Sequence, residues 1–407
     1  MSEHGTGKER ILAALAGGQP DMMPVAIDYL GLYLAERTER AYVEEYRERL
    51  EREGRVRLDP AEDTAIRARA FLRAYEGFEE RQDWLQVFGA PTQEVVSQRE
   101  LVAEDGLVFE CDPGAGTRRE MLLGGEEAKA GELRSRFEEM TRRFERLRSA
   151  GARSPVGAEM VAEYERDFRT HHGNFGLVER LVRERGREQF IYMGVPAPFC
   201  SLYGLIGFEG MMTGLVEAPG LVLDMLEGLL ESILKRVAAF RDSGGDGIRV
   251  EEYFASADIV SPEMYQRFAW PYEERLLSGI RRLGLKGVLY FCGDCMPRLP
   301  ALQQLPLDGL MVEESKKDFN IDIGAVRAQV GPDLCLFGNI DSYALVQRGT
   351  EDQLREEVRR QIHEAGEEGA FVVGIGSPLP LDTPPQRADM LVRLTRAHPC
   401  CTLNVAG

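Results

Sequence analysis

The chain has 407 residues, 43% of them hydrophobic and 29% charged, which is ordinary for a globular protein with a large core. Its length fits two average domains or a single α/β barrel with extensions. The formal net charge of −18 argues against nonspecific binding to nucleic acid or to anionic membranes, because both attract basic surfaces and repel acidic ones. A small substrate stays compatible with this charge, since a local basic pocket can lie on an acidic protein.

Apolar stretches and cysteines bear on the compartment. No apolar run approaches the roughly eighteen residues of a membrane-spanning helix, and residues 1–10 lack an apolar stretch of the signal-peptide type. The seven cysteines are an odd number, scattered between Cys111 and Cys401. In a large chain without an export signal they are expected to be reduced thiols or metal ligands, and not a disulfide framework. We therefore expect a cytoplasmic protein without membrane contact.

The first 150 residues are predicted to be mainly helical. Residues 8–16 carry apolar side chains at helical spacing, and residues 24–28 have the composition of a short buried strand. Between about residues 35 and 80 the chain is dense in Arg and Glu, which is typical of amphipathic helices with solvated charge pairs. A further charged helix is predicted over about residues 125–149. We expect residues 35–150 to form a helical extension or insertion that packs on the remaining fold.

From residue 176 onward, short apolar runs alternate with helical segments. Helices are predicted over residues 177–184, 221–240 and 261–283, the last opened by Ser261-Pro-Glu, whose hydroxyl, proline and acid favour a helix start. Strands are predicted over residues 24–28, 189–194, 247–252, 287–292, 309–313, 334–338 and 370–374. Continuous apolar strands separated by helices indicate a parallel sheet that is buried on both faces.

Seven predicted strands leave two α/β architectures open. A (β/α)8 TIM-type barrel needs one strand more, and an open doubly wound sheet is the alternative. No Gly-x-Gly-x-x-Gly follows the first strand, which favours the barrel. No repeat, low-complexity tract or Pro/Ser-rich linker divides the chain. We therefore predict one α/β domain over residues 1–407, a (β/α)8 TIM-type barrel with an N-terminal helical extension.

The carboxyl ends of the strands define the candidate site, because catalytic side chains of α/β barrels project from them. In chain order these positions carry Asp28, Tyr29, Glu251, Glu252, Tyr253, Tyr290, Cys292, Asp294, Cys295, Glu313, Glu314, Asn339, Asp341 and Ser377. Acids at such places also cap the helices that follow, and for any single acid this explanation is equally good. The hypothesis of an active site therefore depends on the whole set.

Two short motifs could carry chemistry. Cys292-Gly-Asp-Cys295 can provide two corners of a tetrahedral zinc site, with an acid from a neighbouring strand as a further ligand, or a redox dithiol, or neither. A redox dithiol is expected in a thioredoxin-like context, which a barrel strand does not provide. His171-His172 precedes a Gly-rich stretch, where an imidazole could act as acid, base or ligand, although an exposed loop pair explains it as well.

Several segments together resemble the uroporphyrinogen decarboxylase superfamily. They are Lys8-Glu-Arg-Ile-Leu-Ala-Ala-Leu, Pro20-Asp, Pro24-Val, Gly245-Asp-Gly-Ile, Ser261-Pro-Glu-Met-Tyr, Pro271-Tyr, Cys292-Gly-Asp, Gly338-Asn-Ile-Asp341, Gly349-Thr-Glu and Thr383-Pro. The resemblance runs from about residue 8 to residue 396 and is most specific over residues 245–350. It implies a TIM-type barrel, often a homodimer, that is either a decarboxylase or a corrinoid-linked, zinc-dependent methyltransferase.

The sequence departs from both branches of that superfamily. The decarboxylases carry a Met-Arg-Gln-Ala-Gly-Arg-Tyr segment whose arginines meet substrate carboxylates, whereas residues 27–33 here contain Asp28 and neither arginine. A porphyrinogen with eight carboxylates needs cationic partners, so it is disfavoured as the substrate. The methyltransferases use His-x-Cys and a further Cys after the last strand. Here Tyr290 replaces the His, Cys292 is retained, and residues 374–377 contain no Cys, which leaves Cys295 as a displaced zinc ligand.

Three hypotheses follow from the residues and the resemblance. The first is a methyltransferase acting on a small methylated substrate, with a corrinoid (cobalamin) carrier protein as methyl partner and zinc as a further candidate cofactor. The second is a decarboxylase (lyase) acting on a less anionic substrate, and the third is a binding protein that has lost the chemistry. The candidate residues are Asp28, Glu252, Tyr290 and Asp341 for catalysis, Tyr29, Asn339, Glu313 and His172 for substrate binding, and Cys292 and Cys295 for metal.

Overall fold

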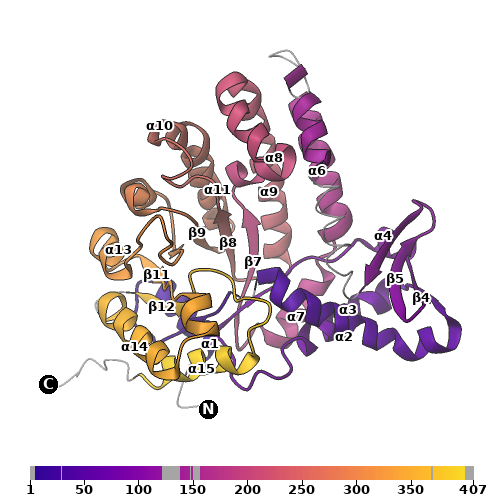
Figure 1. Ribbon diagram of the computed structural model, residues 1–407, viewed down its shortest axis with the longest axis horizontal. Coiled ribbons are helices and arrows are strands. Elements are labelled where there is room, and N and C mark those ends of the chain that lie inside the picture. Colours follow the sequence, from indigo (N-terminus) through magenta and orange to yellow (C-terminus); the bar gives the residue numbers. More distant parts are fainter. Residues whose placement is uncertain are drawn as a thin grey trace.

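Eight parallel strands form a sheet that nearly closes into a barrel (Figure 1). The computed structural model describes residues 5–28, 30–121, 138–146, 148–149, 156–367 and 370–398. The strands follow one another around the sheet as β1 (Val25–Ala26), β12 (Phe371–Gly374), β11 (Cys335–Phe337), β10 (Gly309–Val312), β9 (Lys286–Phe291), β8 (Gly247–Glu252), β7 (Phe190–Pro196) and β3 (Trp84–Gln86). Between β3 and β1 the backbone N–H of Asp83 donates to the Val25 carbonyl at 2.9 Å.

This sheet confirms the predicted (β/α)8 barrel and all seven predicted strands. The eighth strand is β3, which was not predicted.

The helices outside the barrel are α7 (Gly176–Arg185), α8 (Pro198–Glu217), α9 (Pro219–Asp242), α10 (Pro262–Met264), η1 (Tyr265–Ala269), α11 (Trp270–Arg282), η2 (Met296–Arg298), α12 (Leu299–Leu302), α13 (Ile323–Val330), η3 (Ser342–Gln347), α14 (Glu351–Gln361), η4 (Ile362–Gly366) and α15 (Pro385–Arg396). The hydroxyl of Ser261 accepts from the Met264 N–H, as expected for a helix start.

Helix α8 corrects one expectation. By length and composition it could cross a membrane, with a mean hydropathy of 1.3, whereas the sequence analysis found no such apolar run. Within the structure, 56% of that window is buried, and Leu202, Leu205 and Met211 belong to the core beneath the helix layer. Helix α8 packs on α9 and α6. Its apolar character is therefore explained by packing on both sides within the fold.

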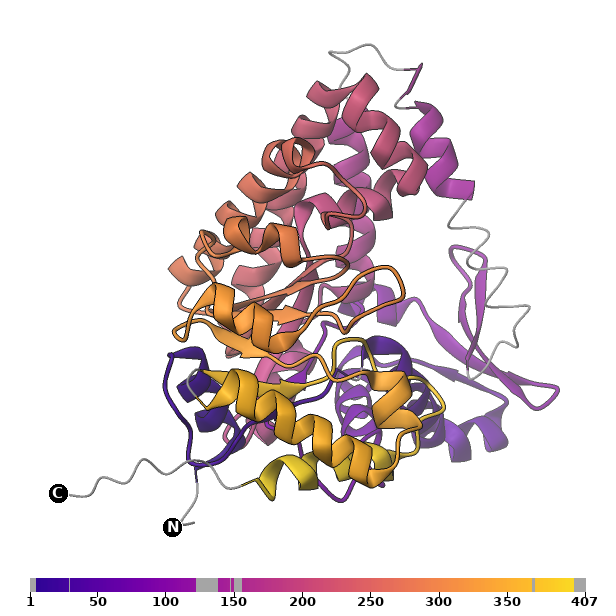
Figure 2. The same ribbon diagram turned by 60° about the vertical axis from the view of Figure 1, so that its left-hand side comes forward.

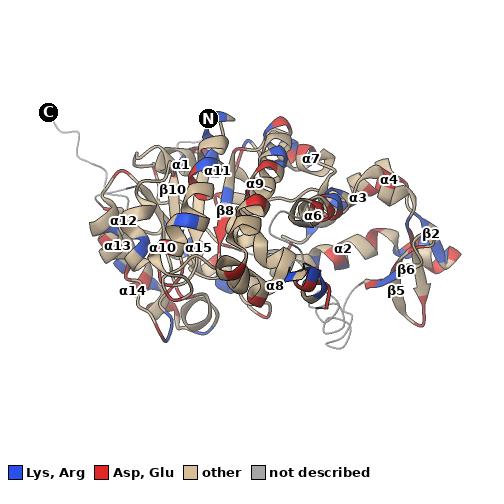
Figure 3. Cartoon of the chain, turned by 90° about the horizontal axis from the view of Figure 1, so that it is seen from above, with Lys and Arg blue, Asp and Glu red and all other residues tan. Residues whose placement is uncertain are grey.

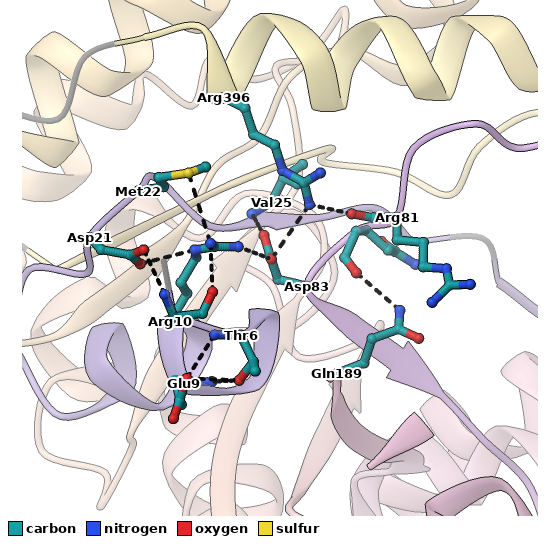
Figure 4. Close-up of polar contacts among 12 residues, drawn as sticks. Thr6, Glu9, Arg10, Asp21, Met22, Val25, Arg81, Asp83, Gln189 and Arg396 are labelled. Atoms are coloured by element: carbon teal, nitrogen blue, oxygen red, sulfur yellow. Dashed lines mark hydrogen bonds and ion pairs between the residues drawn. The ribbon is translucent and has the colours of Figure 1, made fainter. Parts of the chain in front are cut away.

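Helix α1 (Gly7–Leu15) lies at the amino-terminal end of the barrel. Its residues Ile11, Ala14 and Leu15 join the core that fills the barrel interior. The helix begins in a capping box, in which Thr6 and Glu9 satisfy each other's backbone N–H groups. Figure 4 shows the ion pairs and hydrogen bonds that link this helix to the strand starts and to α15. The amino-terminal end of the barrel is thus closed by packing and by charge pairing.

The segment between β1 and β3 extends away from the barrel (Figures 2 and 3). It contains α2 (Leu30–Glu53) and α3 (Pro60–Arg73), which confirm the helices expected over residues 35–80. Between these helices lies β2 (Arg55–Arg57), and after β3 come α4 (Gln93–Ser97), β4 (Glu100–Glu104), β5 (Leu107–Asp112) and β6 (Thr117–Met121). The four strands form an antiparallel sheet in the spatial order β2, β4, β5, β6. Helix α6 (Val156–His172) returns the chain to the barrel.

The predicted helical extension has its helices, but it also contains this four-stranded sheet, which was not predicted. The turn between β4 and β5 carries the signal that was overlooked. Asp105 and Gly106 both have positive φ, 51° and 79°, as in a two-residue hairpin turn, and Asp-Gly is a favoured pair there. Most of the helix expected over residues 125–149 lies outside the described residues. That the extension and the barrel form one domain stays a prediction.

Candidate active site

The alternation of side chains along β8 decides which acids face the barrel interior. Ile248 and Val250 belong to the core between strands and outer helices. Successive side chains of a strand point to opposite faces, so Arg249 and Glu251 point inward. Arg249 accordingly lies 5.5 Å from the ring centroids of both Tyr192 and Tyr290, two residues of the interior core. The carboxyl end of the barrel is therefore built around a buried arginine that the sequence analysis did not single out.

Arg249 bridges two carboxylates inside the barrel. Its Nη1 lies 2.7 Å from Oδ2 of Asp28, and its Nη2 donates to Oε1 of Glu251 at 2.7 Å. The side chains of Arg249 and Asp28 are both fully buried. The pKa of Arg249 is raised despite burial, chiefly by the charge of Asp28, so the guanidinium stays protonated. Among the described residues neither Nη1 nor Nε has a hydrogen-bond partner of good geometry; Nη1 still forms the close ion pair with Asp28, whereas Nε contacts no acid and is a buried donor for a ligand.

Two tyrosines complete the interior wall next to Arg249. The Tyr253 hydroxyl donates to Oε2 of Glu251 at 2.7 Å, and the Tyr290 hydroxyl donates to the Gly376 carbonyl at 2.6 Å. Their rings meet edge to face at 6.1 Å. Burial, together with the neighbouring Cys292 thiol, raises the pKa of Tyr290, so its phenol stays protonated and fixed as a donor. The predicted residues Asp28 and Tyr290 therefore do come together.

Gly293 separates the two cysteines of the predicted zinc motif. Its φ is +78°, and a Cβ there would lie 2.4 Å from the Ser256 Oγ, so the position requires glycine. Cys292 packs against the barrel-interior core, whereas Cys295 belongs to the core beneath the outer helices. Burial raises the pKa of Cys295 to about 12 and also raises that of Cys292. Both groups are therefore held as neutral thiols in different layers.

The described residues do not fit a zinc site. Among them, no group of three or more His, Cys, Asp or Glu side chains is placed to share a metal ion. A thiolate ligand needs a nearby positive charge, yet the negative charge of Glu313 is the largest influence on Cys292 after burial. The hydroxyl of Tyr290 also takes the ligand position that a histidine would need. No step of the proposed chemistry is therefore routed through zinc.

Glu313 lies at the rim of the barrel mouth after β10. One of its carboxylate oxygens accepts from the Gly293 N–H at 2.9 Å, and the other accepts from the Ser377 hydroxyl at 3.3 Å. The ammonium of Lys316 lies 3.4 Å from Glu313 and forms a closer ion pair with Glu314. This predicted substrate-binding residue therefore faces the site, and it also ties together the loops after β9, β10 and β12.

Glu252 was expected in the barrel mouth, but it points outward from β8. It is fully buried beneath the helices, where its Oε1 accepts from the Phe254 N–H at 2.9 Å and its Oε2 has no partner among the described residues. Burial and the charge of Glu273 in α11 raise its pKa, and burial raises the pKa of Glu273 to about 7. Its placement supports a structural, protonated carboxyl and gives no support to a catalytic one. Glu251, one residue earlier, is the acid that faces the site.

Two further candidates are occupied by structural contacts. Asp341 caps η3, because its Oδ1 accepts from the N–H groups of Tyr343 and Ala344 at 2.9 and 2.7 Å. The Asn339 amide donates to the carbonyls of Glu313 and Ile321 at 3.1 and 3.0 Å. Both residues position loops at the carboxyl end, and neither placement supports direct action on a substrate. Tyr29 lies outside the described residues.

His172 lines a cavity of about 420 Å³ between the barrel and the extension. This cavity reaches the barrel at Tyr192, whose ring centroid lies 5.5 Å from the guanidinium of Arg249, and at Gln86, at the end of β3. A Cβ added to Gly194 would lie 2.5 Å from Oε1 of Glu251 and 3.0 Å from the Gln86 amide nitrogen, so both side chains crowd this glycine. Gln86, which lines the cavity, therefore lies beside Glu251, while Asp28, Arg249 and Glu251 themselves lie behind the lining. Of the predicted substrate-binding residues, His172 lines this cavity.

The fold and the site are those of a (β/α)8-barrel protein with a charged, tyrosine-lined mouth. Residues 154–398 match the uroporphyrinogen decarboxylase (URO-D) family, and the chain belongs to that family. Its fold is shared with a methyltransferase from Methanosarcina mazei, with a TM-score of 0.62, 18% identity, and coverage of 96% of this chain and 98% of the other.

Curated relatives are distant and fall into two groups by name. A methylcobamide:CoM methyltransferase of Methanosarcina acetivorans is 24% identical over 196 residues, which is 46% of this chain and 55% of the relative. A uroporphyrinogen decarboxylase of Gloeobacter violaceus is 25% identical over 218 residues, 52% of this chain and 60% of the relative. The chain thus matches little more than half the length of these relatives. Family membership is shown, and the reaction is not decided by these likenesses.

Proposed function

We propose that this protein is a methyltransferase that removes the methyl group of a small methylated substrate, with a separate corrinoid protein as the methyl partner. The bound corrinoid would supply the nucleophile that accepts the methyl group. The names of distant relatives and the shared fold support the methyltransferase branch. The cytoplasmic location, the homodimer and the corrinoid partner remain predictions of the same account.

The observation that carries the proposal is the buried Arg249 with an unpartnered Nε donor. When a methyl group leaves as an electrophile, the bond to it breaks and its electron pair stays on the atom left behind. A fixed guanidinium in a site of low dielectric stabilises that developing negative charge without reorganising. Asp28 and Glu251 hold the guanidinium in place from two sides. Arg249 is therefore assigned the role of charge stabiliser, and Tyr253 keeps Glu251 oriented.

The charge balance at the mouth disfavours a polyanionic substrate. The single positive charge of Arg249 is offset by Asp28 and Glu251. At the rim, Lys316 is offset in the same way by Glu313 and Glu314. A substrate with eight carboxylates would meet net negative charge at both levels and would need cationic partners instead. A small neutral methylated molecule fits this balance.

A decarboxylase remains the second candidate, and the position of Asp28 favours it. This carboxylate is buried at the end of β1, where an acid could steady a cationic intermediate of decarboxylation. The relatives named uroporphyrinogen decarboxylase lend further support. The two candidates differ in what leaves the substrate, a methyl group or carbon dioxide.

The test is methyl transfer to reduced free cobalamin, followed through the visible absorbance of the cobalamin. The purified chain is incubated with a panel of methylated ethers, amines and thiols. We expect at least one compound to be demethylated, and Arg249→Lys to lower the rate by about a hundredfold, because a single ammonium cannot bridge two carboxylates as a guanidinium does. Carbon dioxide release from a carboxylated substrate, without any cobalamin methylation, would establish the decarboxylase instead.

A further inference from the structure

The cavity beside the barrel is lined by aromatic rings from both the extension and the barrel. Its walls come from Ile27, Leu34, Ala35, Thr38, Glu39, Tyr42, Arg67, Phe71, Tyr75, Gln82, Gln86, Phe88, Arg119, Met121, His172, Leu177 and Tyr192. The five phenylalanines and tyrosines of this set lie on α2, on α3, after α3, after β3 and on β7. Rings contributed by four separate parts of the chain form a lining that no single helix or strand could provide.

The charged side chains of this lining are already compensated. The Arg67 guanidinium lies 2.7 Å from an oxygen of the buried Asp63. Arg119 and Glu39 form an ion pair at 2.9 Å. A ligand with a net charge would therefore have to break one of these pairs or enter without a counter-charge, and both are costly.

His172 and two glutamines supply the neutral polar groups of the cavity. Burial lowers the pKa of His172, so its imidazole is neutral near pH 7, and its Nδ1 lies 3.4 Å from the Gly89 carbonyl. Gln82 accepts a hydrogen bond from the Ile27 N–H through its amide oxygen. Gln86 lies beside Glu251 at the barrel end of the cavity. Polar groups of this kind orient a neutral ligand by hydrogen bonds.

We propose that this cavity binds an uncharged molecule with a single aromatic ring. The inference rests on the proposed function, because it identifies the ring-bearing part of the methylated substrate and so makes an aryl methyl ether the substrate class. Ring faces and edges pack best against other rings, and the lining offers several. The departing group would be an aryl oxide. Its oxygen would lie toward Gln86, the lining residue beside Glu251, because Glu251 is paired with the guanidinium of Arg249 that would stabilise the negative charge.

The size of the cavity agrees with one substituted ring. An apolar protein cavity of about 150 Å³ is large enough to hold benzene. The 420 Å³ available here leaves room for a methoxy group and one or two further substituents. A more open cavity of about 990 Å³ shares Arg67, Phe71 and His172 with this one. A macrocycle with eight acidic side chains is therefore disfavoured by charge and not by size, because the arginines of the lining are already paired with acids.

Binding can be measured without any methyl transfer. Trp84 stacks on Tyr192 with ring centroids 4.2 Å apart, so a ligand against Tyr192 alters its environment. The chain has two tryptophans, and Trp270→Phe leaves Trp84 as the sole tryptophan, whose emission is excited selectively at about 295 nm, on the red edge where tyrosine absorbs little. In that background, methoxybenzene should change the emission and bind at least tenfold more tightly than methoxycyclohexane or tetramethylammonium. Equal or stronger binding of either competitor would overturn the proposal.

Matched substitutions place the binding in the cavity. Phe71→Leu and the more exposed Phe88→Leu should each weaken methoxybenzene binding about three- to tenfold, since each removes one ring–ring contact. Phe208→Leu, at an exposed position of α8 outside the cavity, should leave the affinity unchanged. Because Phe88 is 37% exposed, its variant is expected to fold even if the Phe71 variant does not. Unchanged affinity in both cavity variants would contradict the assignment.

The outcome for binding and the outcome for catalysis are separable. If methoxybenzene binds but no aryl methyl ether methylates cobalamin, the ligand class stands and the proposed function fails. If another methylated compound is demethylated while methoxybenzene does not bind, the proposed function stands and the ligand class fails.

Discussion

The two ends of the barrel each hold a buried arginine between two carboxylates, yet they differ in how completely that arginine is bound. At the amino-terminal end, Arg10 donates to Asp21 at 3.0 Å, to Asp83 at 3.2 Å and to the Gly5 carbonyl (Figure 4). All three of its nitrogens are used. At the carboxyl end, Arg249 uses both terminal nitrogens on Asp28 and Glu251, and its Nε is left without a partner among the described residues.

Among the described residues, buried Arg236 of α9 also has an unpartnered Nε, so the unused donor marks a functional arginine only together with the position of Arg249 inside the carboxyl end of the barrel. Buried polar atoms are nearly always hydrogen-bonded, and an exception needs an explanation. Arg10 leaves no nitrogen without a hydrogen bond. Its partner Asp83 also accepts a hydrogen bond from the Val25 N–H and lies 3.7 Å from Arg396. Around Arg249 the unused donor lies where barrel proteins carry out their chemistry. An unsatisfied donor costs stability and is understandable where a ligand completes it.

Removing the functional arginine should have the largest effect on stability. Arg249→Met leaves Asp28 and Glu251 buried without their cation, which we expect to cost about 3–5 kcal/mol of unfolding free energy. Adding Asp28→Asn should recover at least about 1 kcal/mol, because one buried charge disappears. Urea unfolding measures both. If the double variant is no more stable than the single one, Arg249 does not compensate Asp28.

The matched change at the other end is Arg10→Met. It should cost somewhat less, about 2–3 kcal/mol, because Asp83 keeps its hydrogen bond from Val25 and its contact with Arg396. The activity of the folded fraction should stay within twofold of the unsubstituted protein. A large loss of activity there would remove the distinction between the two ends.

The next effect concerns pH and the buried pair of Glu252 and Glu273. Burial raises the pKa of Glu273 to about 7 in the folded state, against an ordinary value of 4.5. The folded state therefore binds more protons than the unfolded state between these values, so stability is lost as pH rises from about 4.5 through 7. This loss of unfolding free energy should be on the order of 3 kcal/mol. Glu273→Gln should remove it, because an amide does not titrate, and the amide oxygen still accepts the hydrogen bond of the Tyr265 hydroxyl.

Urea unfolding of both proteins at pH 5 and pH 8 measures the difference. The Gln variant should be the more stable of the two at pH 8, and the two should converge at pH 5. Parallel losses with rising pH would mean that Glu273 is not protonated in the folded state at low pH.

A pair of glycines offers a smaller test of the same comparison. Gly194→Ala places a Cβ 2.5 Å from Glu251 and so displaces a movable side chain in the site. We expect a loss of less than about 1 kcal/mol in stability, together with a several-fold lower turnover. Gly309→Ala, near the amino-terminal end, places a Cβ 2.9 Å from Phe337 and 3.0 Å from Leu15. It should cost about 1–3 kcal/mol and leave the turnover of folded protein unchanged.

The smallest effect is expected for Cys292→Ser. Its neutral thiol packs at the mouth, and no described residues join it in a set of metal ligands, so the variant should lose less than about 1 kcal/mol. Zinc in the purified protein, measured by plasma mass spectrometry, should be well below one atom per chain and unchanged by the substitution. Stoichiometric zinc that disappears in Cys292→Ser would restore the metal hypothesis.

The barrel could be predicted because most of its strands are continuous apolar runs. The strand that was missed, β3, has three residues and follows Gln82 and Asp83, so neither its length nor its flank marks it. The two polar residues before β3 are explained only by tertiary contacts. The Asp83 carboxylate accepts a hydrogen bond from the Val25 N–H in β1, and the Gln82 amide oxygen accepts one from the Ile27 N–H, just after β1. The antiparallel sheet was predictable from its Asp105-Gly106 turn.

The prediction placed the catalytic acid of β8 one residue too late, at Glu252, whereas the acid that faces the barrel interior is Glu251. Glu251 and Glu252 are adjacent acids, and periodicity alone does not say which of them faces the interior. The apolar partners Ile248 and Val250 carried that information, since they place Arg249 and Glu251 on the opposite face. Arg249 itself was overlooked because an arginine inside a strand of a parallel barrel is unusual. Its partner Asp28 is more than two hundred residues away, a pairing that only the closed barrel creates.

The most direct test of the account compares Arg249→Lys and Arg10→Lys in the methyl-transfer assay with reduced cobalamin. Both variants keep a positive charge, and both lose the ability to bridge two carboxylates. The account predicts a rate about a hundredfold lower for Arg249→Lys and a rate within twofold of the unsubstituted protein for Arg10→Lys. Equal rates in the two variants, per folded molecule, would contradict the claim that the carboxyl end of the barrel is the functional end.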